Sequence, residues 1–399
     1  MMKKLFILTF AVLLLMGTTS MATDTRVLTM GDNNTVLLDD ANIWLFPSRI
    51  FEYQKIAVGE FGVNDDFTNF GVHWAFGNDN PIVFGTYFSK LAPAVPTDLL
   101  GGNLVPFDFA LLDNRRIDFL YGNQVGDLTL GARISYYNSS QEFDYPADQS
   151  EEGFSYYDFD FGLTPSGGAW DLAVNVGFGS WTDKNAVGQK ETEADGFMDI
   201  GVLGRYFWQR NPNYTFIPHA GFFHSKRGII DNLYDGDPAT TDDRTDKYTW
   251  TGWDLGIGTN YTPAANVLAV MDFGFMYGKW KDEVDITLPA AATGETTESY
   301  SVLPYFKIGL DADVFKWMDV RLGATSYWTS FTEEDKGANE KFKAKYAAND
   351  TYLGFGFHWN RLHVDTYTDP ELFLQGFDFI SGNGDTDMNF QLSVVYEMM

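Results

Sequence analysis

The residues of this chain that could do chemistry are a few histidines and a large excess of acids. An enzyme that uses histidine as a base needs a carboxylate or a serine within hydrogen-bond reach of the imidazole. Only His363 has an obvious carboxylate on the same face nearby in sequence, at Asp365, and no nucleophile motif accompanies the pair. Alternating residues also share a face by chance. The sequence therefore argues against an enzyme. The five histidines are His73, His219, His224, His358 and His363.

The acids gather in runs such as "DGDPATTDDRTD" (235 to 246) and "GNGDTD" (382 to 387). Carboxylate oxygens suit calcium, but neither run has the glycine and terminal glutamate of an EF-hand loop, so solvated loops are the simpler interpretation. The chain has no cysteine, which excludes disulfides and thiolate metal sites. We expect no metal and no cofactor.

The charge and the first residues restrict the class of protein. A net charge of −28 would repel a phosphate backbone, which excludes nucleic acid as a partner. The chain begins "MMKKLFILTFAVLLLMGTTSMATD", which is typical of a secretory signal peptide covering residues 1–22, with cleavage after Ala22. No later run is apolar and long enough for a transmembrane helix, so a membrane span would have to be β.

The elements that would position these residues alternate in polarity. In "TWTGWDLGIGTNYT" (249 to 262), Trp253, Leu255 and Ile257 share one face, while Asp254 and several glycines share the other. A glycine-rich face suits an enclosed interior better than open solvent. The apolar face would then meet lipid. The same division recurs in "LTLGARISYY", "WDLAVNVGFGSW" and "FKIGLDADV".

This pattern predicts an all-β fold: a transmembrane antiparallel up-and-down β-barrel of an even number of strands, about fourteen to sixteen, over residues 55–399. From residue 123 onward the connections alternate short and long, as in outer-membrane barrels with short periplasmic turns and long outer loops. The long connections are expected at 139–152, 182–196, 225–247, 280–299 and 330–349. The predicted strands are 55–61, 68–76, 81–88, 115–122, 128–138, 153–163, 169–181, 197–208, 213–224, 248–261, 265–279, 300–313, 317–329, 350–359, 361–367 and 388–397.

Both chain ends are expected in the periplasm. The last strand, "FQLSVVYE", has the alternation that is used in barrel assembly. The expected partners are therefore the barrel-assembly machinery and outer-membrane lipid. Residues that face inward could set the electrostatics of a lumen or pair within the wall. The inward candidates are Arg133, Asp171, Arg205, Asp254, Asp272, Lys307, Asp311, Asp313 and Arg321.

Residues 23–54 lack strand alternation and are expected to form a periplasmic or plug segment. They contain Met30-Gly31, Asp39-Asp40, Asn42 and Pro47, a plan that resembles the N-terminal segment of FadL-like outer-membrane transporters and their PorV-like relatives. That resemblance implies a plug inside or beneath the barrel. No residues here match a fatty-acid site, so none is carried over.

Two functions remain open from the sequence, both in the bacterial outer membrane. The first is a channel or transporter for passive or plug-gated passage of small solutes, hydrophobic ones among them. The alternative is a structural or docking barrel without an open pore, with a PorV-like role in secretion or surface assembly.

Overall fold

The computed structural model describes residues 23–62, 69–77, 80–88, 116–145, 148–185, 190–232, 244–287, 292–368 and 390–398. The expected signal peptide lies outside the described residues, as does most of the acidic run 235–246 and all of 382–387. Among the described residues, no helix is both long enough and apolar enough to cross a membrane.

The described strands form one closed antiparallel barrel of sixteen strands. Each strand pairs with the next in sequence, and β1 (Ile56–Gly62) also pairs with β17 (Phe390–Glu397), which closes the ring. Two strand segments, β8 (Lys190–Tyr206) and β9 (Trp208–Asn211), both pair with β10 (Tyr214–Asp231) and together occupy one position in the ring. The prediction of an even, up-and-down barrel is confirmed, with sixteen strands rather than fourteen.

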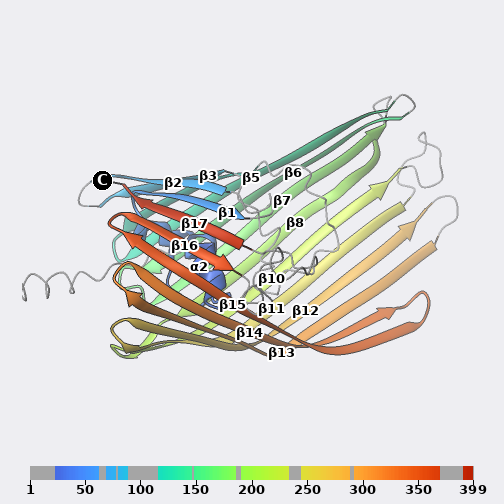
Figure 1. Cartoon of the computed structure of the whole chain (residues 1–399). Helices are drawn as coiled ribbons and strands as arrows, with labels where there is room; N and C mark the ends of the chain where they lie inside the picture. Colours follow the sequence, from blue (N-terminus) through green and yellow to red (C-terminus); the bar gives the residue numbers. More distant parts are fainter. Residues whose placement is uncertain are drawn as a thin grey trace, which may run out of the picture.

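The remaining strands are β2 (Asn69–Phe76), β3 (Ile82–Phe88), β4 (Arg116–Val125), β5 (Leu128–Tyr145), β6 (Asp148–Pro165), β7 (Trp170–Asn185), β11 (Arg244–Ala264), β12 (Val267–Ile286), β13 (Ala292–Phe315), β14 (Met318–Asp335), β15 (Glu340–Trp359) and β16 (Leu362–Thr368). Figure 1 shows the short strands β1, β2, β3, β16 and β17 together on one side of the barrel, with the long strands extending beyond them.

The strands differ from the predicted ones mainly at one end. Residues 139–145 and 340–349 were expected in long loops, yet they continue β5 and β15 as paired strand. Hydrophobic alternation marks only the part of a strand with lipid on one side, because an extension with water on both sides has no apolar face to repeat. Hairpin pairing continues the backbone ladder past that point.

The two faces of the wall follow the predicted parity. Leu255 and Ile257 are about half exposed on the outside, at 51% and 53%, whereas Asp254 is buried at 4%. The apolar outer surface and closed hydrogen bonding make the chain an outer-membrane β-barrel.

The N-terminal segment, residues 23–55, contains one short α-helix and two 3-10 helices but no strand. They are α2 (Asp24–Thr29), η1 (Asp40–Trp44) and η2 (Pro47–Glu52). Figure 1 shows α2 within the ring of strands, near the end at which the chain terminates. Most of the segment is buried.

Candidate functional site

The N-terminal segment lies against the inner face of the barrel, and inward glycines leave room for it. A side chain at Gly131 would place its Cβ atom 2.1 Å from the backbone nitrogen of Ser48. Gly31 of the segment adopts φ +77°, and a Cβ there would lie 2.4 Å from the carbonyl oxygen of Ile308. Glycine is the residue that permits both the left-handed backbone and the close approach. The glycine-rich inner face thus has a packing role.

The first anchor between segment and wall is the Asp171 carboxylate, which is 2% exposed. From the segment, Arg49 donates its Nε and Nη2 to Asp171 at 3.0 and 2.9 Å. From the wall, Arg205 donates its Nε at 2.7 Å, and Thr164 donates its hydroxyl at 2.6 Å. One buried carboxylate therefore joins a segment arginine to a wall arginine.

Arg205 also holds the backbone of the segment. Its Nη1 donates to the carbonyl oxygens of Thr35 and Leu37 at 2.9 and 3.2 Å, and its Nη2 donates to Asn42 Oδ1 at 2.8 Å. The guanidinium lies 4.4 Å from the ring centroid of Phe46, a cation–π contact. With a further contact from Nη1 to the Asn34 carbonyl oxygen at 3.4 Å, a single wall side chain contacts five positions of the segment.

The second anchor is Arg26 of α2. It donates to Asp311 of the wall at 3.0 and 3.1 Å and to Asp39 of the segment at 3.2 Å. Arg321 lies on the other side of Asp311, with its Nε 3.3 Å from the same carboxylate oxygen. It also forms an ion pair with Asp365. Removing one partner from such a buried network leaves an uncompensated charge, which costs about 3–5 kcal/mol.

Two other inward candidates also contact the segment. Lys307 donates to the backbone and side-chain oxygens of Asp32 at 2.7 and 2.9 Å. Arg133 pairs with Asp160 at 2.7 Å and donates to the Trp44 carbonyl at 3.2 Å. The segment is therefore held around much of the ring.

Asp254 and Asp272 are linked through a histidine. His219 lies between them, with Nδ1 3.2 Å from Asp254 and Nε2 3.0 Å from Asp272. The Tyr305 hydroxyl is 3.5 Å from Nε2. This buried group forms part of the wall beside the segment.

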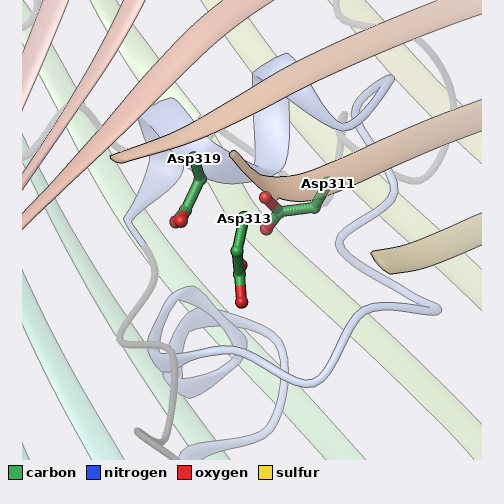
Figure 2. Close-up of side chains that lie close together, drawn as sticks. All are labelled: Asp311, Asp313 and Asp319. Atoms are coloured by element: carbon green, nitrogen blue, oxygen red, sulfur yellow. The ribbon is translucent and has the colours of Figure 1, made fainter. Parts of the chain in front are cut away.

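Asp313, the last of the inward candidates, is exposed and lies beside Asp311 and Asp319 (Figure 2). One carboxylate oxygen of each lies within 4.8 Å of the others, which is close enough for a shared cation. Arg26 and Arg321 already contact Asp311, and Arg321 also contacts Asp319 at 3.1 Å. These arginines supply compensating positive charge to Asp311 and Asp319, so those two acids act first as partners of the second anchor.

The residues that resemble the FadL-like segment serve local structure. Asp39 caps η1, and Asn42 completes a capping box with it. Asp40 is buried, and burial together with the neighbouring Asp39 carboxylate raises the pKa of Asp40 well above its ordinary value. Met30 is fully buried, and Pro47 begins η2.

An apolar layer lies inside the barrel next to the segment. Phe46 packs in one cluster with aromatic and aliphatic side chains from β7, β8 and β10 to β13, and the partly buried Trp280, Tyr327 and Phe331 pack against it. The wall members of the cluster are Ala173, Leu203, Phe223, Trp250, Met276, Tyr300, Val302 and Tyr305.

Sequence reasoning missed several of the contacting residues. Asp160 and Asp319 share the inward parity of neighbours that were selected, so the same alternation would have found them, and Asp365 was considered only as a partner of His363. Arg26 and Arg49 lie where no periodicity exists, and only the fold shows their partners. Asp365 contacts Arg321 and Thr23, while His363 Nδ1 lies 2.8 Å from His358 Nδ1.

No family model matches the chain, and no curated protein matches it. Solved structures with a similar fold include the toluene transporter TodX of Pseudomonas putida, at 8% identity and a TM-score of 0.40, covering 95% of this chain and 98% of that one. The CymD monoaromatic hydrocarbon channel has 9% identity and a TM-score of 0.38, covering 93% and 96%.

The ferric yersiniabactin uptake receptor FyuA of Yersinia pestis has 13% identity and a TM-score of 0.38, with 64% of this chain and 44% of that one covered. This chain thus spans less than half of the FyuA receptor. Such TM-scores carry no argument about function, and the fold assignment rests on strand pairing.

Proposed function

We propose that the barrel passes small solutes across the outer membrane and that the N-terminal segment gates this passage as a plug. The observation that supports the proposal is the pair of buried anchors, Arg49–Asp171–Arg205 and Arg26–Asp311–Arg321. Both fix the segment across the inside of a barrel of sixteen strands, a size that can enclose an aqueous channel.

The solute class follows from the lining next to the plug. The apolar cluster around Phe46 and Trp250 would favour small solutes with hydrophobic or aromatic parts, because such side chains dominate ligand-binding sites. The charged residues next to it are compensated by one another, so they would serve the plug more than the solute.

The test is conductance of the purified protein in planar bilayers. Deleting residues 26–50 removes both segment arginines, and steady conductance should rise above that of the intact chain. Acids outnumber bases among the inward candidates, so the opened pore should be weakly cation-selective, because fixed negative charge raises the local cation concentration. Unchanged conductance in a correctly assembled deletion variant would refute the plug.

A point variant tests the same proposal in case the deletion variant fails to fold. Asp171→Asn leaves the buried arginines Arg49 and Arg205 without their shared anion, at a cost of about 3–5 kcal/mol to seating of the segment. It should increase the frequency of channel openings. Arg210→Gln is the matched control, because Arg210 is an exposed arginine stacked over Trp208.

The second candidate is a docking or structural barrel without a pore. It is favoured by the same anchors, since buried ion pairs can serve as permanent fixation as well as a gate. Silence of both the deletion and the point variant in bilayers, with the barrel intact, would support this function instead.

A further inference from the structure

The outside of the barrel carries a compact basic patch on three neighbouring strands, β10, β11 and β12. Cross-strand pairs place Phe222, Trp253 and Tyr277 in one row across them. Phe222 and Trp253 are exposed on the outer face, at 44% and 36%. An outward aromatic row of this kind marks the membrane interface.

The next two rows toward the long-hairpin end are basic. The first contains His224, Thr251 and Lys279, and the second contains Lys226, Thr249 and Lys281. Both pairings run through these positions without a register shift, so their side chains keep the outward parity of the aromatic row. One row further, Lys247 is opposite Glu283. We call Lys226, Lys247, Lys279 and Lys281 the outer lysine patch.

The outer lysine patch carries more positive charge than its neighbouring carboxylates compensate. Lys226, Lys247 and Lys279 are exposed, and none of them forms an ion pair with another described residue. Lys281 pairs with Glu283 at 2.7 Å and lies 3.4 Å from Glu295. This local excess of lysine stands against the balance of the whole chain, which has 27 basic and 55 acidic residues.

The inner face of these strands carries acids closer to the middle of the barrel. By parity, the acids Asp254 and Asp272 face inward, and both are buried. The hydroxyl of Thr249 lies between the lysines and can donate a hydrogen bond to the same anion, while the hydroxyl of Thr251 lies 2.9 Å from His224 Nδ1.

The spacing of the patch suits a phosphate. Lys226 and Lys281 lie on either side of Thr249, two strand spacings or about 10 Å apart, and Lys279 is about 7 Å from Lys281 along the strand. Flexible lysine stems allow these ammonium groups to converge on one or two phosphates. On β8, Met198 and Ile200 are opposite Lys226 and His224 and extend the apolar surface beside the patch.

We propose that the outer lysine patch binds the phosphates of a lipid A-type glycolipid in the outer leaflet. Outer-membrane barrels have short turns in the periplasm and long loops outside, which places the patch just above the external aromatic row, at headgroup level. The lysines neutralise the phosphates, and the neighbouring apolar residues contact the acyl chains. This binding is independent of solute passage through the lumen.

The test measures binding of purified lipid A to the full-length protein in detergent micelles by native mass spectrometry. Lipid A carrying both phosphates should bind, and the same lipid with its phosphates removed should bind far more weakly. For Lys226→Gln/Lys279→Gln, affinity should fall about 30-fold, since each lysine near an anionic surface contributes about 1 kcal/mol and 1.4 kcal/mol is tenfold.

The matched control is Lys55→Gln/Lys316→Gln, which removes the same charge at the short-turn end and should leave affinity unchanged. Retention of the compact form on unheated gels shows that each variant is a closed barrel. Equal affinity for both lipids, an unchanged affinity in the patch variant, or the same loss in the control would each overturn the proposal.

Discussion

At the scale of single residues, the inside of this barrel depends on shared charges. Asp171 joins Arg49 to Arg205, and Asp311 joins Arg26 to Arg321. Each carboxylate lies between an arginine of the segment and one of the wall. Loss of Asp171 would leave the buried Arg205 without its carboxylate partner, whereas Arg26 and Arg321 would each keep another one, Asp39 and Asp365. The residues that resemble the FadL-like segment mostly shape these contacts through caps and turns.

A residue-scale prediction concerns Asp40. Because its pKa is raised in the folded protein, the folded state binds the proton more tightly, and this stabilisation is present at low pH and is lost as pH rises through the folded pKa. Asp40→Asn removes that dependence. We expect the variant to be more stable than the parent at pH 8, with a smaller difference at pH 5.

The measurement is the midpoint of thermal unfolding in detergent at the two pH values. The amide of the Asp40→Asn variant can still donate a hydrogen bond to Asp39, as the protonated acid does. If the parent and the variant lost stability equally between pH 5 and pH 8, Asp40 would not carry the raised pKa.

At the scale of elements, each strand has one face for lipid and one for the interior. Ile257 of β11 lies on the outside opposite Phe273, and both are more than half exposed. Asp254 of the same strand faces inward to His219. The inner face accepts polar groups that the outer face cannot.

The element-scale prediction compares these faces. Ile257→Arg should weaken folding into lipid vesicles by about 2–4 kcal/mol, the cost of arginine on the lipid side near the midplane. Asp254→Asn should fold as the parent does, because His219 keeps its hydrogen bond to Asp272 and an amide oxygen can accept from its Nδ1. Urea titration in vesicles gives both free energies. Similar losses in the two variants would contradict the assigned faces.

At the scale of the whole molecule, the barrel is asymmetric from end to end. The described turns between β4 and β5 and between β6 and β7 are short, while β5 and β6 and the later hairpins extend far on the opposite side. The N-terminal segment and the last strand meet at the short-turn end, where Met398 donates its backbone N–H to the carbonyl of Lys55. We therefore expect the long hairpins to be outside the cell.

The absence of native cysteine makes this orientation directly testable. Ala338→Cys, in the exposed β14–β15 turn, should react with a membrane-impermeant maleimide on intact cells. Ser166→Cys, in the exposed turn before β7, should react only after the outer membrane is permeabilised. The reverse labelling pattern would invert the barrel and place the outer lysine patch in the periplasmic leaflet.

The sequence by itself determined which segments form the strands of the barrel wall and which face of each strand points outward. Alternation as in "WDLGIG" predicted the strands, their two faces and the outward position of residues such as Leu255, because lipid on one side imposes a strict period of two. The same period predicted the inward position of Asp171 and Arg205. This alternation could not predict the ends of the long hairpins, because both faces of the strands contact water there and the period of two disappears.

Only the tertiary structure decided what the inward charges do. Arg49 and Asp171 are far apart in sequence, and nothing in the local pattern pairs them, since residues 23–55 have no periodicity. Closing the ring brings β7, β8 and the N-terminal segment together. A charged side chain enclosed there needs an oppositely charged neighbour, because burial of an unpaired charge costs too much free energy.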